Sequence, residues 1–355
     1  MIYIHVPFCK SFCVYCGFYS EICSSRKAFE SYAEGIRKEI QERQDEISAA
    51  LGLNTLYIGG GTPSVLPPDI LGSITELLPG GYEEFTFEAN PDDITPEYVK
   101  ALKALGVNRL SLGVQSFDDR VLRLMGRRHD SEGAVSAVRS ARDGGIGNIS
   151  IDLIFGAPSL TDGVWEESLR TALELRPNHI SAYQLSVEEG SILEERLRKG
   201  LFREAGEEEC RRQYDTLCRI LGGAGYRHYE VSNFALPGFE ARHNGAYWKR
   251  LPYVGLGPGA HSFDGKARRS WNSRGTALWT REEERLGPED EAAERIMLAL
   301  RTDEGLPEDE LLKYGNPDAV KALLSEKALL RIPGGRIRIP EDRFFVCDDI
   351  ISSLI

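Results

Sequence analysis

The chain has 355 residues, of which 41% are hydrophobic and 28% charged, and its formal net charge is −12 at pH 7. This length suits one large domain with a smaller one, and the acidic balance argues against nucleic acid as a partner, because phosphate binding relies on basic surfaces. We find no run of 18 apolar residues that would span a membrane. Seven cysteines without a paired framework favour a reducing compartment, so we expect a cytoplasmic protein.

The first predicted strand, residues 2–6, leads directly into three cysteines with CxxxCxxC spacing, Cys9, Cys13 and Cys16. Three thiolates can hold three irons of a [4Fe-4S] cubane and leave the fourth iron open to a chelating ligand. A structural zinc site usually has four protein ligands, and ferredoxin clusters use four cysteines. The triplet therefore favours an open iron-sulfur site, while zinc and coincidental spacing stay open as alternatives.

Strands and helices alternate through the first 205 residues. Apolar or β-branched runs predict further strands at 55–58, 85–88, 109–114, 149–154 and 179–185. Helical spacing and capping residues predict helices over 29–47, 95–106 and 130–142. This alternation predicts parallel strands with right-handed crossovers. Six units are too few to close an eight-stranded barrel, so the expected fold is α/β, a partial (β/α)6 barrel.

Polar residues follow the ends of these predicted strands. They are Gly59-Gly60-Gly61-Thr62-Pro63, Glu88, Asn90, Gln115, Asp152 and Gln184. Barrel-like folds carry their functional groups at the carboxyl ends of the strands, so we expect one binding rim. Taken alone, the glycines suit a plain turn, and Glu88 or Arg127 suits a solvated charge. With an open iron they indicate a zwitterionic nucleoside: Glu88 for its ammonium, Arg127 for its carboxylate, and Gln115 and Asp152 for sugar hydroxyls.

Beyond residue 201 the repeat lapses. We expect a helix at 207–221, a strand at 227–231 and a loop at 233–263. The charged stretch at 280–290 suits a linker or the start of a solvated helix. A helix at 319–330, a hairpin at 329–339 around Pro333-Gly334-Gly335 and a short helix at 348–354 follow. The last three elements suggest a small winged-helix-like α+β module. The expected division is a barrel at 1–205, an accessory region at 206–285 and a C-terminal module at 286–355.

The run His243-Asn244-Gly245-Ala246-Tyr247-Trp248 offers groups that suit haem. Histidine is a common axial ligand of haem iron, and the aromatic pair offers flat apolar surface to a porphyrin. Lys249 and Arg250 follow and suit propionates. A satisfied core histidine with core aromatics is the alternative, and His261 is a weaker second ligand candidate.

Taken together, these motifs resemble the radical S-adenosylmethionine (SAM) superfamily from residue 3 to about 185. The motifs that resemble its oxygen-independent coproporphyrinogen III oxidase branch are YIHVPFC at 3–9, GGGTP at 59–63, FEANP at 87–91, GVQSF at 113–117 and IDLIFG at 151–156. The resemblance implies that Cys9, Cys13 and Cys16 hold a [4Fe-4S] cluster. It assigns SAM to Tyr3, Gly60, Thr62, Glu88, Gln115, Arg127 and Asp152. In this family a reduced cluster donates one electron to SAM and releases a 5′-deoxyadenosyl radical.

Within this branch the chain is similar to the HemW subgroup of haem chaperones. The oxidases continue the cysteine motif with a fourth cysteine, where this chain has Phe18. They also carry an N-terminal extension that closes the site, which we expect to be absent because eight residues precede Cys9. The HNxxYW run and GLGPGAHS at 255–262 match the subgroup. The resemblance implies that haem contacts His243, Asn244, Tyr247 and Trp248, with His243 on the iron.

The resemblance therefore implies a haem chaperone that binds haem and transfers it to haem-requiring acceptor proteins, respiratory proteins among them. An oxygen-independent coproporphyrinogen III oxidase is the enzymatic alternative, and a radical SAM enzyme with an unrelated substrate is the second. Whether SAM is cleaved, which would require an electron donor, does not follow from these residues. A homodimer and a peripheral membrane contact also stay open.

Overall fold

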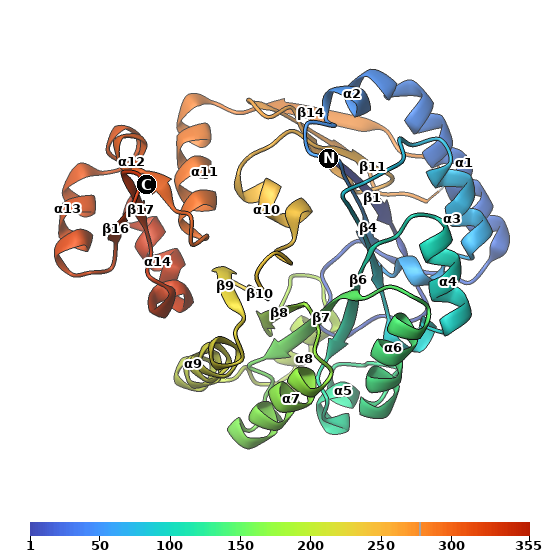
Figure 1. Cartoon of the computed structure of the whole chain (residues 1–355), viewed down its shortest axis with the longest axis horizontal. Coiled ribbons are helices and arrows are strands. Elements are labelled where there is room, and N and C mark those ends of the chain that lie inside the picture. Colours follow the sequence, from blue (N-terminus) through green and yellow to red (C-terminus); the bar gives the residue numbers. More distant parts are fainter. Residues whose placement is uncertain (277) are drawn as a thin grey trace.

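A computed structural model of the chain describes residues 1–276 and 278–355. The strands of its main sheet that follow one another in the barrel are β1 (Ile2–Val6), β4 (Thr55–Gly60), β5 (Glu84–Ala89), β6 (Arg109–Gln115), β7 (Asn148–Phe155) and β8 (His179–Gln184). Each pairs in parallel with the next, and Figure 1 shows them curving into an open arc. The predicted partial (β/α)6 barrel is confirmed.

Helices cover the outer face of this arc (Figure 1). They are α1 (Arg26–Glu42), α2 (Gln44–Ala49), α3 (Pro68–Thr75), α4 (Pro96–Ala104), α5 (Asp119–Leu124), α6 (Ser131–Asp143) and α7 (Asp162–Glu174). Helix α4 begins as predicted, because the Thr95 side chain accepts a hydrogen bond from the Tyr98 N–H and Pro96 occupies the first position. Gly106, with φ of +96°, follows the end of this helix.

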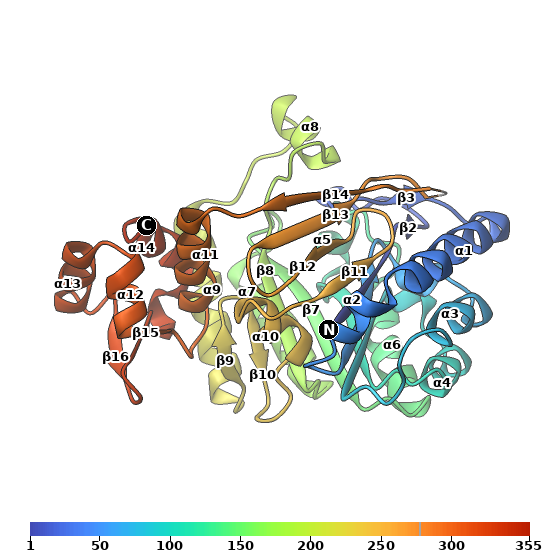
Figure 2. The same ribbon diagram turned by 90° about the horizontal axis from the view of Figure 1, so that it is seen from above.

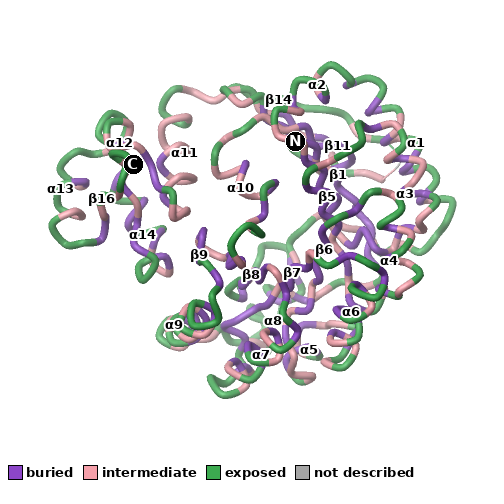
Figure 3. Tube along the Cα trace, in the orientation of Figure 1, coloured by how far each residue is buried: buried purple, intermediate pink, exposed green. Residues whose placement is uncertain are grey.

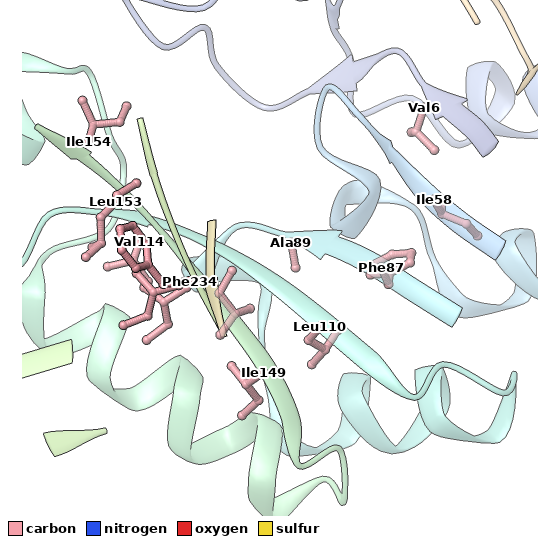
Figure 4. Close-up of a cluster of buried hydrophobic side chains, with 14 of the residues drawn as sticks. Val6, Ile58, Phe87, Ala89, Leu110, Val114, Ile149, Leu153, Ile154 and Phe234 are labelled. Atoms are coloured by element: carbon pink, nitrogen blue, oxygen red, sulfur yellow. The ribbon is translucent and has the colours of Figure 1, made fainter. Parts of the chain in front are cut away.

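The hydrophobic core lies between the strands and these helices. Along β6, the buried Leu110, Leu112 and Val114 alternate with Arg109 and Ser111, so each strand presents an apolar face outward and a polar face inward. Figure 3 shows burial concentrated along the strands, and Figure 4 shows part of the apolar cluster. The side chains labelled there are Val6, Ile58, Phe87, Ala89, Leu110, Val114, Ile149, Leu153, Ile154 and Phe234.

The predicted loop at 233–263 is wrong, because this segment contains four regular elements. They are β10 (Asn233–Ala235), α10 (Arg242–Trp248), β11 (Val254–Leu256) and β12 (His261–Phe263). Strand β11 pairs in parallel with β1, while β10 pairs in antiparallel fashion with β8 and with β9 (Arg227–Glu230). Strands of three residues show no periodicity in the sequence; their backbone groups are satisfied by the free edges of the barrel sheet.

A second, antiparallel sheet crosses the molecule beside β11 (Figure 2). It contains β12, β13 (Arg268–Asn272) and β14 (Arg281–Arg285). The charged stretch at 280–290, predicted as a linker or a helix start, therefore contains an exposed edge strand, β14, and the beginning of α11 (Pro288–Leu300). Figure 2 also shows α8 (Ile192–Arg198) projecting from the body, where the Leu193 N–H donates to the Val14 carbonyl at 2.7 Å.

The C-terminal segment forms a small module at one end of the molecule (Figures 1 and 2). Its elements are β15 (Leu306–Pro307), α12 (Glu308–Tyr314), α13 (Pro317–Ser325), β16 (Leu330–Ile332), β17 (Arg336–Arg338) and α14 (Cys347–Ser352). The predicted hairpin and flanking helices are confirmed, and the hairpin joins β15 in one sheet. The module packs beside α9 (Glu207–Gly223), which is the helix predicted at 207–221. No helix among the described residues is both long and apolar enough to cross a bilayer.

A buried ion pair ties the first helices to the second half of the chain. Arg43 donates from Nη1 to Glu39 Oε1 at 2.7 Å and to the Gly255 carbonyl of β11 at 2.7 Å. Its Nη2 donates to the Ser262 hydroxyl of β12 at 2.9 Å. Both members of the pair are buried. Removing one member of such a pair leaves the other charge buried without compensation.

We expect Arg43→Met to lower the free energy of unfolding by about 3 kcal/mol, because Glu39 would keep its charge in the core without its cation. Urea unfolding followed by circular dichroism measures this change. Lys38→Met on the same helix is the control, since the Lys38 side chain is 70% exposed and its ion pair is solvated. Equal losses in the two variants would contradict a role for the buried pair.

Candidate functional site

A cavity of ≈ 670 Å³ lies inside the arc and opens at the carboxyl ends of its strands. Ten of the residues that the sequence analysis assigned to the cluster, SAM or haem line it: Cys9, Cys13, Cys16, Gly60, Thr62, Glu88, Gln115, Arg127, Asp152 and Asn244. Gly61, Pro63, Asn90 and Gln184 of the predicted rim line it as well. Parallel pairing delivers the strand ends to one edge, so residues far apart in the chain meet there. Cavities of this size and polarity are typical of small-molecule sites.

The pairing of β1 with β4 places the loop of the three cysteines (residues 9–16, the cysteine loop) beside the loop at residues 59–63 (the glycine loop). The Gly61 N–H donates to the Val6 carbonyl at 2.8 Å, and the Thr62 N–H donates to the Phe8 carbonyl at 2.7 Å. Cys9 Sγ then lies 3.3 Å from Thr62 Oγ1. A Cβ atom at Gly61 would lie 2.8 Å from the Phe8 carbonyl oxygen, so only glycine allows this approach.

The Arg127 guanidinium connects the cysteine loop to two other strand ends. Its Nη1 donates to Cys13 Sγ at 3.1 Å, and its Nη2 donates to Asn90 Oδ1 and to the Gly113 carbonyl, both at 2.6 Å. Burial raises the pKa of Cys16, so a bound metal would have to displace its proton.

The three thiols suit a cluster better than a single metal ion. Cys9, Cys13 and Cys16 are free and share the lining of one cavity. Within the described parts of the chain, no three His, Cys, Asp or Glu side chains converge where one ion could be held. Three cysteines that each bind a separate iron of a cubane need no such convergence. The donor set therefore fits a [4Fe-4S] cluster.

Glu88 is held in the cavity wall by two donors. Its Oε1 accepts from the Tyr57 hydroxyl at 2.6 Å, and its Oε2 accepts from the Gly60 N–H at 3.1 Å. Burial raises the pKa of Glu88 to about 7, against the lowering effect of the Tyr57 hydrogen bond. Gly60 has φ of +115°, and a Cβ there would lie 2.7 Å from the His5 ring. A buried carboxylate of this kind is suited to an ammonium or sulfonium ligand.

Gln115 and Asp152 complete the far wall. Gln115 ends β6 at an irregularity in its pairing with β7 and has φ of +67°, a strained conformation for a residue with a side chain. Asp152 accepts from the Ser111 hydroxyl at 3.1 and 3.3 Å through its two oxygens. Burial raises the pKa of Asp152, so a ligand hydroxyl that donates to it would favour its ionised form.

Tyr3 is separated from the other residues assigned to SAM. It is not among the described residues that line the cavity. Its hydroxyl lies 2.9 Å from His5 Nδ1, and its ring centroid lies 6.0 Å from that of Tyr57. Tyr3 therefore supports Tyr57, and through it Glu88, from behind the cavity wall.

The HNxxYW run forms α10, which packs against β4 on one side and α11 on the other. His243 is 0% exposed, with Nδ1 2.9 Å from Thr55 Oγ1 and Nε2 3.0 Å from the Tyr247 hydroxyl. Burial lowers the pKa of His243 to about 3, so the ring is neutral. The Arg242 and His243 N–H groups, at the start of the helix, donate to the Glu84 carboxylate at 2.8 and 3.0 Å.

The residues predicted for haem therefore separate into two groups. Asn244 lines the cavity, whereas His243 lies behind it with both ring nitrogens engaged. Tyr247 and Trp248 are half-buried. The two predicted propionate partners already pair with acids: Lys249 Nζ lies 2.7 Å from Glu304, and Arg250 Nη2 lies 3.4 Å from Glu294.

The sequence analysis missed several residues that line the cavity, namely Tyr57, Arg109, Ser111, Ser181 and Tyr183. They occupy alternate positions on β4, β6 and β8, where polar side chains interleave with fully buried apolar ones. This two-residue period was readable in the sequence. It marks the inner face of the barrel, which a search for residues at strand ends overlooks.

Comparisons with known proteins agree with this geometry. The family model of the Radical SAM superfamily matches residues 3–172. A "Heme chaperone HemW" of Lactococcus lactis is 39% identical over 266 residues, covering 74% of this chain and 69% of that protein. A "Heme chaperone HemW" of Mycobacterium tuberculosis is 31% identical over 373 residues, covering 100% of this chain and 94% of that protein.

The fold also matches a solved structure of coproporphyrinogen III oxidase (HemN) from Escherichia coli, described as a radical SAM enzyme. The TM-score is 0.80, and the match covers 99% of this chain and 89% of that chain. Sequence identity is 21%, so this likeness concerns the fold alone.

We expect Glu88→Gln to gain stability relative to the unmodified protein as the pH rises. The pKa of Glu88 is higher in the folded than in the unfolded protein, so protonated Glu88 favours the folded state. The unmodified protein loses this stabilisation as the pH rises from the unfolded pKa, near 4, to the folded pKa of about 7. Between pH 5 and pH 8 the difference in free energy of unfolding should shift by about 2 kcal/mol in favour of the variant. Urea unfolding at both pH values measures it, and Glu97→Gln on the exposed face of α4 should show no such shift. A pH-independent difference for Glu88→Gln would contradict the raised pKa.

Proposed function

This chain belongs to the HemW family of the radical SAM superfamily, and we propose that it is a haem chaperone, which binds haem and passes it to acceptor proteins that require haem. The observation that carries this proposal is the similarity, over the whole chain, to proteins named heme chaperone HemW. Phe18, at the place where the oxidases have a fourth cysteine, also supports a chaperone rather than a coproporphyrinogen oxidase.

The cofactors of this function are a [4Fe-4S] cluster and SAM. Cys9, Cys13 and Cys16 would hold the cluster, and when both groups are bound they supply one-electron chemistry. The residues that would bind SAM are Gly60, Thr62, Glu88, Gln115, Arg127 and Asp152, with Tyr3 in support. Glu88 suits the ammonium group, because a cation there would offset the energetic cost of burying its carboxylate. Arg127 would hold the SAM carboxylate next to Cys13.

Haem is the cargo, and the HNxxYW run is the proposed place of its capture. His243 would bind the iron through Nε2, which must first leave the Tyr247 hydroxyl. That release would also free Tyr247, so that Tyr247 and Trp248 could pack on the porphyrin face. Asn244 would remain at the cavity wall, adjacent to both sites. Haem ligation in this scheme requires α10 to move away from β4.

Further features of this function stay predictions. We place the protein in the cytoplasm, because its seven cysteines are free thiols. The acceptor is a haem-requiring protein, and an electron donor, a homodimer and a peripheral membrane contact stay predictions. The division of the chain at residues 205 and 285 is also a proposal. The accessory region is not separate from the barrel sheet, because β10 and β11 pair with barrel strands.

Adding haem to the purified protein should produce a Soret band that His243→Ala weakens or shifts, since the iron would lose its axial ligand. Tyr247→Phe is the matched variant, because it removes the hydroxyl that holds His243 Nε2 and leaves the imidazole in place. We expect it to bind haem at least as tightly as the unmodified protein. An unchanged Soret band in a folded His243→Ala variant would overturn the assignment of His243.

Cys13→Ala should remove the visible absorbance of the reconstituted cluster, because three ligands are needed to retain it. Cys23→Ala is the control, since Cys23 is a half-buried thiol outside the described lining of the cavity.

Anaerobic incubation of the reconstituted protein with coproporphyrinogen III and SAM tests the alternative function, a coproporphyrinogen III oxidase. Substantial formation of protoporphyrinogen IX would overturn the chaperone proposal in favour of an oxidase.

A further inference from the structure

The inner face of the barrel holds an arginine with almost no partner. Arg109 begins β6 and is 2% exposed. Its side chain makes one hydrogen bond to the described residues, from Nη1 to Thr86 Oγ1 at 3.4 Å, which is long. Its buried Nε has no partner there. No carboxylate oxygen of the described chain lies within 4.0 Å of its guanidinium.

The second deeply buried arginine shows how the same chain treats a structural guanidinium. Arg43 has a side chain that is 6% exposed, and each of its nitrogens donates to an oxygen. The partners include two carboxylates, Glu39 and Glu46, at 2.7 and 2.9 Å. A buried guanidinium in this protein can therefore be fully satisfied by its own chain, and Arg109 is not.

Arg109 belongs to the cavity and not to the outer core. It lines the cavity together with Ser111 and Gly113, the residues two and four positions further along the same face of β6. Asp152, Ser181 and Asn244 line it as well. Arg109 stands six residues before Gln115, and a strand of that length spans roughly 20 Å. The polar floor around Arg109 is therefore distinct from the rim where Arg127 meets the cysteine loop.

A buried cation without a counter-charge costs several kcal/mol of folding free energy, about as much as breaking a buried ion pair. The neighbouring acids compensate it poorly. Burial raises the pKa of Glu88 to about 7 and also raises that of Asp152, although the charge of Arg109 lowers the pKa of both acids. Neither carboxylate lies within 4.0 Å of the Arg109 guanidinium. A single substitution of Arg109 by an apolar residue would remove this cost, since apolar residues fill the inner layers of (β/α)8 barrels. Arg109 therefore points to a ligand that completes its pairing.

We propose that Arg109 is the base of an anion subsite on the barrel floor and that its ligand is a carboxylate. A planar guanidinium pairs with a carboxylate through two parallel hydrogen bonds. The Asn244 amide, which lines the same cavity, can donate a further hydrogen bond to the same oxygens. The subsite thus takes the acidic side chain of a ligand that enters the cavity from the rim.

Two molecules of the proposed function carry a carboxylate: haem, through its propionates, and SAM, through its methionine end. The separation of roughly 20 Å between Arg109 and the rim favours a propionate. A SAM molecule placed at the cysteine loop has Arg127 for its own carboxylate. The haem form of this subsite rests on the proposed chaperone function, whereas the existence of the anion subsite does not.

The test compares ligands with and without the acid, in the full-length protein and in Arg109→Gln and Arg109→Lys. Haem and haem dimethyl ester are titrated by the Soret band, and SAM and decarboxylated SAM by equilibrium dialysis with the reconstituted protein. We expect the unmodified protein to bind haem at least about tenfold more tightly than the ester. In Arg109→Gln this preference should vanish, and in Arg109→Lys it should be partly retained.

If Arg109→Gln loses the preference for SAM over decarboxylated SAM but keeps the preference for haem over its ester, the subsite belongs to SAM. Unchanged preferences for both ligand pairs in Arg109→Gln would overturn the subsite. A protein that binds no haem at all would overturn the chaperone proposal, and the SAM pair would then decide the subsite alone.

Stability without ligand gives an independent measurement. If Arg109 is kept for a ligand, Arg109→Met should leave the free energy of unfolding unchanged or increased, because it removes an uncompensated charge. Arg43→Met is the matched control and should be strongly destabilised. A loss in Arg109→Met as large as that in Arg43→Met would show that Arg109 is structural and would overturn the subsite.

Discussion

The parallel pairing of β1 with β4 is the constraint on which the site depends. It aligns Val6 with Gly60, so that the loop carrying the three cysteines and the loop carrying the glycines leave the sheet side by side. Two backbone hydrogen bonds beyond the strands, to the carbonyls of Val6 and Phe8, extend this pairing into the loops. A shift of the register by one residue would turn the polar face of β1 into the core and separate Cys9 from Thr62. β11 pairs with the other edge of β1 and so secures it from both sides.

The barrel and its rim were predictable because their signals are long and repeated. Six apolar or β-branched runs, separated by helical patterns and followed by candidate binding residues, leave few alternatives for topology. The short strands β10 and β11 gave no such signal, since three residues carry no period and form only where an edge is free. His243 illustrates another limit. Its residue type suits iron, but the sequence does not reveal that Thr55 and Tyr247 already occupy both ring nitrogens.

The placement of polar groups divides stability from function within each strand. The outward side chains of β5 to β8 are apolar and pack under the helices, whereas the inward ones include Thr86, Ser150 and His179. In closed (β/α)8 barrels, layers of mostly branched apolar side chains fill the interior. Here that volume is given to a cavity, and the strain at Gln115 and the unpaired Arg109 lie on its wall. Stability is therefore supplied by the outer core, which leaves the inner face free to serve ligands.

The hydrogen bonds of His243 also bear on the kinetics of cargo exchange. If its imidazole must leave a partner before it can reach iron, the competent conformation is a minor one. One lost hydrogen bond of about 1 kcal/mol lowers its population roughly fivefold, and two lower it about thirtyfold. Uptake would then follow the frequency at which α10 opens instead of the collision rate. Because the Tyr247 hydroxyl and the iron compete for the same nitrogen, closure of α10 would also displace bound haem. Such a carrier would take up haem slowly and would release it when an acceptor surface favours the closed position of α10.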